Sequence, residues 1–408
     1  MPIRERIVLF IGSGFSVDYG LPVTSKLQDR LLDEIGDPLE VSQEAFITKT
    51  IRGFWREVFG WRGSCERPSL EDHFTEIDLA ANTGHYLGRS YGPKKLRALR
   101  RMTIHRVFRL LDVHPQPAPH VDDLVATLLG SFHIAIVTTN WDIMAERCLE
   151  RLGRPFFYTR QPDSRFPERA PHGVPLWKLH GSGNWGYCDV CRTLITSEIG
   201  LGKVAVQFGW LLEPEDFKLF PGGGRVAKHL ATAFRDCLGC GGRVAARVAT
   251  FSYRKHLDVP FFQSIWDEAR DTLRSADRWL FIGYSLPEAD IEIRHLLKTA
   301  ELSRPGKSRP RIDVLLKDDP DAPLRYRRLF GRSVNRIDNS GIAAWTRKVL
   351  PAYCQSTSSG QGSYPLDNIN RSGGGSRLSS VNVPCTNPLR GNSVATTCES
   401  QVGADHRG

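Results

Sequence analysis

Three polar side chains that follow apolar segments could carry out chemistry in this chain. Asn140 and Asp142 lie in Thr-Thr-Asn-Trp-Asp, directly after the apolar segment 132–137, and His180 ends the segment that begins at residue 174. Polar residues at the carboxyl end of a parallel strand lie where α/β sheets bind ligands, and a histidine placed there can act in catalysis. The alternative is structural, because Asn140 or Asp142 could cap the next helix and a single histidine often belongs to a core. We treat these three residues as candidate catalytic residues.

Two Cys-x-x-Cys pairs predict a metal site. Cys188 and Cys191 form the first pair, and Cys237 and Cys240 form the second pair 45 residues later. Because the chain shows no export signal, this spacing favours metal binding over disulfides. Four thiolates complete a tetrahedral zinc ion and leave no position for water, so we expect a structural zinc site.

A glycine-rich turn follows the first apolar run of the chain. Residues 7–11 are typical of a buried strand, and Gly12, Ser13, Gly14, Phe15 and Ser16 come next, before a predicted helix. Strand, turn and helix start together can cradle a phosphate. The spacing matches neither the dinucleotide fingerprint nor the Walker pattern, so an ordinary tight turn is the alternative.

Predicted strands and helices alternate along the chain. Strands are expected at 7–11, 132–137, 174–179, 279–282 and 312–316, and helices at 23–32, 43–59, 70–79, 95–111, 121–129, 143–152, 261–275, 289–300, 325–330 and 342–350. This alternation predicts an α/β fold with a Rossmann-like, mostly parallel sheet. Its strand ends gather at one edge, which brings the phosphate cradle beside Asn140, Asp142 and His180 and suggests a nucleotide whose ribose end undergoes chemistry.

The chain divides by composition into six segments. We expect 1–38 to begin the nucleotide-binding domain, 39–117 to form a helical insertion and 118–183 to continue the domain. We expect 184–250 to form an inserted zinc module with four cysteines, 251–351 to complete the domain and 352–408 to be a disordered tail. The gap between the cysteine pairs should hold extra strands or a helix, including 203–212.

Composition narrows the class of protein. The chain has 408 residues, 40% hydrophobic and 25% charged, with a formal net charge of +10, which is typical of a globular protein. Its arginines are scattered, so we do not expect a nucleic-acid surface. No apolar run approaches the roughly 18 residues of a membrane span, and no signal-peptide pattern opens the chain, so we expect a cytoplasmic protein. Nothing in the sequence specifies an oligomeric state.

Five segments, in order along the chain, resemble motifs of the sirtuin family. Residues 12–16 resemble its Gly-Ala-Gly-x-Ser phosphate loop, and 138–142 are similar to its Thr-Gln-Asn-x-Asp segment. Residues 179–181 match its Leu-His-Gly, the paired cysteines match its zinc ribbon, and 283–285 resemble its Gly-Thr-Ser.

This resemblance implies NAD⁺ as cosubstrate and cleavage of the nicotinamide–ribose bond. It implies that Asn140 orders the ribose and an attacking water, that Asp142 shapes the nicotinamide pocket, and that His180 acts as general base toward a ribose hydroxyl. The cofactor contacts that it implies are Gly12, Ser13, Gly14, Phe15, Ser16, Thr139, Gly283, Tyr284 and Ser285.

The chain departs from the protein deacylases of that family at two places. Val-Thr-Ser at 23–25 stands where those enzymes continue Asp-Phe-Arg. Their Phe-Gly-Glu segment after the zinc ribbon pairs with an acyl-lysine peptide, and here only Phe-Gly-Trp at 208–210 is similar, between the cysteine pairs. The resemblance is therefore closer to divergent bacterial sirtuin-like proteins, some of which hydrolyse NAD⁺ in defence against phage.

Three hypotheses on function follow. The first is an NAD⁺ hydrolase that uses water as acceptor. The second is an NAD⁺-dependent deacylase (deacetylase) acting on an acyl-lysine protein substrate, which should release nicotinamide only when acyl-lysine is supplied. The third is a non-catalytic module that binds NAD⁺ or ADP-ribose without turnover.

Overall fold

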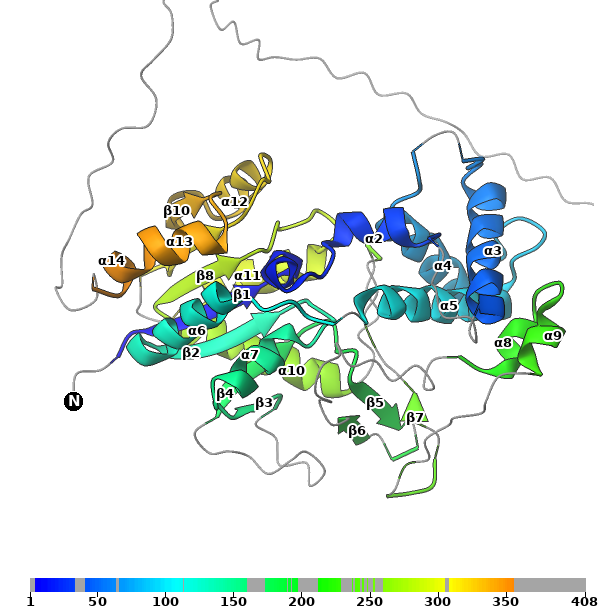
Figure 1. Cartoon of the computed structure of the whole chain (residues 1–408), viewed down its shortest axis with the longest axis horizontal. Coiled ribbons are helices and arrows are strands. Elements are labelled where there is room, and N and C mark those ends of the chain that lie inside the picture. Colours follow the sequence, from blue (N-terminus) through cyan, green and yellow to red (C-terminus); the bar gives the residue numbers. More distant parts are fainter. Residues whose placement is uncertain are drawn as a thin grey trace, which may run out of the picture. The chain divides into compact units, whose positions relative to one another are not determined.

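A parallel sheet of seven strands forms the centre of the structure, in the order β10-β9-β8-β1-β2-β4-β3 (Figure 1). Every neighbouring pair of strands runs parallel. The strands are β1 (Arg6–Ile11), β2 (His133–Thr138), β3 (Phe156–Phe157), β4 (Val174–Lys178), β8 (Arg278–Ile282), β9 (Arg311–Leu315) and β10 (Val334–Asp338). The predicted α/β class with a mostly parallel sheet is confirmed.

The structure is a computed structural model, and the residues that it describes belong to the unit formed by residues 1–360. The described residues are 4–33, 41–63, 66–112, 114–159, 173–188, 190–191, 193–196, 212–228, 237, 239–242, 244–245, 248, 252–253, 260–304 and 308–355. None of the described helices is long and apolar enough to cross a membrane.

The central strands end at the same level. Ile11 at the end of β1 lies opposite Thr138 of β2 and Ile282 of β8. Thr138 in turn lies opposite Lys178, the last residue of β4. The segments that leave these four strands therefore emerge side by side at one edge of the sheet, as expected for parallel strands.

Helices cover both faces of the sheet, as the alternation of side chains shows. Trp279 and Phe281 point to one face, where both contact the ring of Phe330 on α12 (Ala322–Phe330). Arg278 points to the other face, where it lies over the ring of Tyr353 on α14 (Leu350–Gln355). Burial on both faces explains why the central strands are continuous apolar runs.

The remaining helices of the sheet domain follow the strands in chain order. They are α1 (Ser13–Ser16), α2 (Thr24–Arg30), α6 (Pro119–Ser131), α7 (Met144–Arg151), α10 (Pro260–Ser275), α11 (Ile291–Leu302) and α13 (Ile342–Lys348), and 3-10 turns lie at Val17–Tyr19 and Gly331–Ser333. Helix α10 packs on β1 and β4, and α13 packs on α6.

The helical insertion consists of α3 (Val41–Val58), α4 (Leu70–Thr83) and α5 (Pro93–Leu111). A fully buried histidine joins the three helices, because Trp55 Nε1 donates to His73 Nδ1 at 2.9 Å and His73 Nε2 lies 2.9 Å from Thr103 Oγ1. Burial lowers the pKa of His73 to about 3, so the ring is neutral at physiological pH. An Nδ1 that accepts requires the proton on Nε2, which then donates to Thr103.

Two short helices between the cysteine pairs pack on this insertion. They are α8 (Pro214–Lys218) and α9 (Gly223–Ala227), and they contact α5 and α3 respectively (Figure 1). Asp216, which is buried, accepts two hydrogen bonds from the guanidinium of Arg101 on α5. Part of the segment 184–250, which we expected to be a zinc module, thus belongs to the helical insertion by its packing.

The structure differs from the predictions at several element boundaries. Strand β10 was not predicted, because Val-Asn-Arg-Ile-Asp is an edge strand in which no residue is fully buried and no apolar run occurs. The tail was predicted to begin at 352, but α14 continues to Gln355, since Tyr353 is buried and donates to Asp313 Oδ2 at 3.0 Å. Residues 356–408, and 203–211 of the expected extra elements, lie outside the described residues.

Close backbone contact joins the segments that follow β1 and β8. The amide of Gly12 donates to Ile282 O at 3.0 Å, and that of Gly14 donates to Gly283 O at 2.9 Å. A Cβ on Gly12 would lie 2.6 Å from Gly283 O, and a Cβ on Gly283 would lie 2.4 Å from the carbonyl carbon of Gly14. These glycines are needed because the two backbones touch.

We predict that Gly283→Ala lowers the free energy of unfolding by about 2–6 kcal/mol, since a positive φ and an overpacked contact each cost roughly 1–3 kcal/mol. Gly153→Ala is the matched control, because Gly153 has nearly the same φ (60° against 62°) but no atom near its Cβ position. It should lose only about 1–2 kcal/mol. Urea unfolding measures both, and equal losses would show that the contact between the segments contributes nothing.

Candidate functional site

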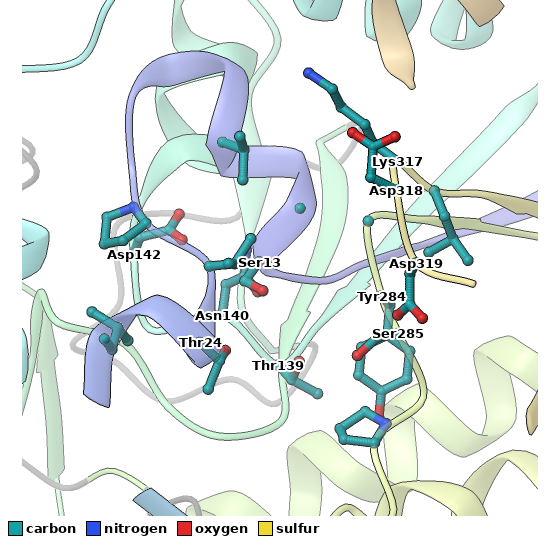
Figure 2. Close-up of a pocket in the computed structure, with 18 of the residues that line it drawn as sticks. Ser13, Thr24, Thr139, Asn140, Asp142, Tyr284, Ser285, Lys317, Asp318 and Asp319 are labelled. Atoms are coloured by element: carbon teal, nitrogen blue, oxygen red, sulfur yellow. The ribbon is translucent and has the colours of Figure 1, made fainter. Parts of the chain in front are cut away.

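A cavity of about 700 Å³ opens at the carboxyl edge of the sheet. Figure 2 shows labelled side chains from several segments around it, with Ser13, Asn140 and Asp142 on one side and Lys317, Asp318 and Asp319 on another. The predicted site residues that line the cavity are Ser13, Gly14, Thr139, Asn140, Asp142, His180, Gly283, Tyr284 and Ser285. The structure therefore brings most of the predicted site together. A volume of this size is within the range of small-molecule sites.

The other three predicted residues support the wall from behind. Gly12 does not line the cavity, and Phe15 and Ser16 are buried. Phe15 packs against Tyr19, with ring centroids 6.0 Å apart. The amides of Gly12 and Gly14 donate to the β8 segment, and that of Phe15 donates to Gly12 O, so these three N–H groups are not directed at a ligand. The expected phosphate cradle thus offers fewer amides than the sequence suggested.

Asn140, Ser16 and Asp142 form one hydrogen-bonded chain. Asn140 Nδ2 donates to Gly12 O at 3.0 Å and to Ser16 Oγ at 3.3 Å. Ser16 Oγ donates to Asp142 Oδ2 at 2.9 Å, and Asp142 Oδ1 accepts from the amide of Met144 at 2.9 Å. Both amide protons of Asn140 are thus used within the protein, which leaves its carbonyl oxygen for a ligand.

The capping alternative for Asp142 is correct in part. Ile143 is the N-cap residue of α7, but Asp142, one residue earlier, accepts a hydrogen bond from the Met144 amide in the first turn of that helix. The same carboxylate also accepts from Ser16 and lines the cavity, which a cap alone does not require.

Burial raises the pKa of Asp142. The charge of Lys178, the Met144 amide and the Ser16 hydroxyl oppose this effect, and the nearby charge of Glu146 adds to it. A carboxyl whose pKa is raised at the wall of a cavity is typical of a functional site.

The segment that carries His180 is bound to the Asn140 segment through the backbone. Leu179 N donates to Thr138 O at 2.9 Å, and Gly183 N donates to Trp141 O at 2.8 Å. On the other side, Trp266 Nε1 of α10 donates to Leu179 O at 3.0 Å. His180 is 5% exposed and faces the cavity from this turn.

The segment after β8 is held by α12. Tyr326 donates to Tyr284 O at 2.7 Å, and Arg325 donates to Ser285 O at 2.9 Å. The hydroxyl of Tyr284 donates to Asp290 Oδ2 at 2.7 Å, and burial raises the pKa of Tyr284 well above its usual value. Because this hydroxyl is already engaged, Tyr284 contributes shape to the cavity rather than a titrating group.

Sequence reasoning missed the far side of the cavity. Lys317, Asp318 and Asp319 line it after β9, and Thr24 of α2 and Leu111 of α5 also contribute. Asp318 adopts a left-handed φ of 54°, which is uncommon for aspartate. The available signal was the position of Lys-Asp-Asp after a predicted strand, the same criterion that identified Asn140 and His180.

The four predicted metal ligands form one cluster. Cys188 ends β5 (Trp185–Cys188), which pairs antiparallel with β6 (Thr193–Thr196) and β7 (Val244–Ala245). The sulfurs of Cys188 and Cys240 are 3.5 Å apart, as are those of Cys191 and Cys237, and all four lie within 4.8 Å of one another. Zinc–sulfur bonds of about 2.3 Å in a tetrahedron place sulfurs about 3.8 Å apart, so this donor set fits zinc. No described cysteine is in a disulfide.

Comparison with known proteins gives matches among solved structures only. No family model and no curated protein matches the chain. One matched structure is an ADP-ribose complex of a mutant Sir2 homologue, with 15% sequence identity, 88% of this chain and 96% of the other covered, and a TM-score of 0.40. Another is Sir2 bound to acetylated peptide, with 14% identity, 86% of this chain and 94% of the other covered, and a TM-score of 0.39. A structure concerned with the mechanism and regulation of Sir2 enzymes also matches, with 16% identity, 87% of this chain and 94% of the other covered, and a TM-score of 0.37. Because these TM-scores are low, we infer the function from the geometry of the site and not from these matches.

Purified protein should contain about one zinc ion per chain, because four thiolates bind zinc and structural zinc stabilises its fold directly. Cys240→Ser should lose the metal and lower the melting temperature. Cys354→Ser, a change outside the cluster on α14, should keep the metal. Elemental analysis and thermal unfolding measure both effects. Metal-free wild-type protein with the same melting temperature as the zinc-loaded form would contradict the site.

Asp142→Asn should raise the free energy of unfolding at pH 7. The folded protein holds the Asp142 proton more tightly than the unfolded chain, so ionisation above the ordinary pKa of 3.8 opposes folding. The advantage of the variant should shrink as the pH falls and vanish below about 3.8, where the carboxyl is protonated in both states. Asp271→Asn, on the exposed side of α10, is the control and should change stability by less than about 0.5 kcal/mol. Chemical denaturation across pH measures this, and a less stable Asp142→Asn at pH 7 would contradict the role of burial.

Proposed function

We propose that this protein is a sirtuin-like enzyme that consumes NAD⁺ by cleaving its nicotinamide–ribose bond, with water as the acceptor. One observation carries the proposal. Asn140 and Asp142, which the buried Ser16 connects by hydrogen bonds, line a cavity of about 700 Å³ that His180 also lines. An amide, a carboxyl and an imidazole thus converge on one space, as an enzyme that acts on a polar ligand requires.

The cavity has features that suit a dinucleotide. Its walls come from the segments after β1, β2, β4, β8 and β9, so it extends across the centre of the parallel sheet, where α/β folds bind nucleotides. Ser13 and Gly14 line part of the cavity with small side chains, which leaves room for a pyrophosphate. Asp142 lies on one side of the cavity and Asp318 lies on another (Figure 2).

Each polar residue of the wall has a task in this proposal. NAD⁺, when bound, supplies the labile bond between nicotinamide and ribose. The free carbonyl oxygen of Asn140 orients the ribose or a water, because its amide protons are held by Gly12 and Ser16. The imidazole of His180 accepts a proton from a ribose hydroxyl or from water. Asp142 shapes the pocket for the nicotinamide amide group and holds Ser16 in place.

Water as acceptor is favoured over acyl-lysine by the sequence. The family's peptide-binding Phe-Gly-Glu segment has no counterpart after the second cysteine pair, and 208–210 lies outside the described residues. An acyl-lysine substrate remains the second candidate, distinguished by whether turnover needs a peptide.

Purified protein should release nicotinamide from NAD⁺ without any peptide, and His180→Ala should lower the rate by about 10²–10⁴-fold, the usual contribution of a general base. His295→Ala is the matched control, because His295 is an exposed residue of α11 away from the cavity, and it should retain the rate of the wild type. Chromatographic detection of nicotinamide, with and without an acetyl-lysine peptide, makes the measurement.

The outcomes separate the candidate functions. Release that requires the peptide would replace the hydrolase with a deacylase at the same site. Binding of ADP-ribose without release in either condition would replace both with a binding module. Release that His180→Ala does not change would place the chemistry elsewhere in the protein.

A further inference from the structure

A buried lysine and a buried glutamate lie directly behind the wall of the cavity. Lys178 is the last residue of β4, and Glu146 is in the first turn of α7. Lys178 Nζ lies 2.7 Å from Glu146 Oε1, and neither side chain has exposed area. The same ammonium donates to the backbone carbonyl of Asp142 at 2.5 Å. Neither residue lines the cavity.

A contribution to folding stability does not by itself explain why Lys178 and Glu146 form a buried ion pair. Removing two charges from water costs free energy that their mutual attraction often does not recover, and an apolar pair of the same size is frequently as stable. A buried ion pair can, however, fix one arrangement of the groups to which it is hydrogen-bonded. The hydrogen-bond partners of Lys178 and Glu146 therefore indicate what the ion pair does.

Lys178 fixes the segment that carries Asn140 and Asp142. Its bond to Asp142 O joins two backbone bonds between that segment and the His180 turn, Leu179 N to Thr138 O and Gly183 N to Trp141 O. Of the three, only the Lys178 bond reaches Asp142 itself. Asp142 then holds Ser16, and Ser16 accepts from Asn140.

Glu146 connects the same pair to the far end of the His180 turn. Tyr158 donates its hydroxyl proton to Glu146 Oε1 at 3.0 Å, and Asn184 Nδ2 donates to the Tyr158 hydroxyl at 3.4 Å. Lys178 and Asn184 lie on either side of the turn that contains His180 in the chain. Both ends of this turn are thus connected to one carboxylate.

We infer that Lys178 and Glu146 are positioning residues, whose buried ion pair holds Asp142 and His180 in their relative places at the cavity. This inference rests on the proposed function for its catalytic consequence. Its structural part, that the pair fixes the segments 138–144 and 179–183, stands independently of the reaction.

The test replaces the pair with neutral side chains of similar size. The double variant Lys178→Met with Glu146→Gln removes both charges of the pair together, and the amide oxygen that it introduces on α7 can still accept from Tyr158. The control is Arg101→Met with Asp216→Asn, which removes an ion pair between α5 and α8 in the helical insertion. Both proteins are compared with the wild type in melting temperature, in kcat and KM for NAD⁺, and in amide hydrogen exchange without ligand.

We expect the Lys178/Glu146 double variant to fold with a melting temperature close to that of the wild type. Its kcat should fall about 10- to 100-fold, the effect of a misplacement of about 1 Å, while KM changes by less than about threefold. Exchange should be faster in 138–144 and 179–183 and unchanged elsewhere. The control pair should leave kcat and exchange in those two segments unchanged.

Two results would overturn the inference. One is a double variant with wild-type kcat, and the other is unchanged exchange in both segments. If the wild type itself releases no nicotinamide, the proposed function fails, and the exchange measurement alone then decides the inference, because faster local exchange supports it and unchanged exchange contradicts it.

Discussion

The register of the central parallel strands is the constraint on which the rest of the structure depends. Because β1, β2, β4 and β8 end at the same level, four segments that are distant in sequence leave the sheet side by side. Their approach is then fixed by contacts that tolerate no extra atom, above all the backbone of Gly14 against that of Gly283. A shift of one strand by one residue would exchange its side chains between the two buried faces of the sheet and would separate the polar groups at the edge.

Several polar groups at this edge are buried at a cost in free energy. Burial raises the pKa of Asp142, and Lys178 and Glu146 are charged residues without exposed area. The helical insertion contains a buried polar network without charge. There the neutral ring of His73 forms hydrogen bonds with two neighbouring side chains and adds no buried charge. Buried charge beside the cavity contributes little to stability by itself, which favours function as the reason for this arrangement.

Much of this arrangement could be predicted from the local sequence, and the features that could not be predicted depend on contacts or burial that the local sequence does not show. Continuous apolar runs identified the buried strands, and the polar residues after them identified Asn140 and His180. Pattern reasoning could not find β10, which is only partly buried and has no apolar run. It also could not find the packing of α8 on α5, which depends on a pair 115 residues apart, Arg101 and Asp216. It also treated Gly12 and Gly14 as phosphate-binding, whereas their amides bond to the neighbouring segment. Only the three-dimensional contact between two segments could reveal that use.

We propose that the edge of the sheet where β1, β2, β4 and β8 end binds a nucleotide. Amide hydrogen exchange of the purified protein, with and without saturating NAD⁺, tests it most directly, because the measurement locates a ligand whether or not turnover occurs. If NAD⁺ binds there, exchange should become slower in the segments 13–17, 139–142 and 283–285, which line or support the cavity. No protection in any of these segments, or protection confined to the cysteine cluster or the helical insertion, would contradict it.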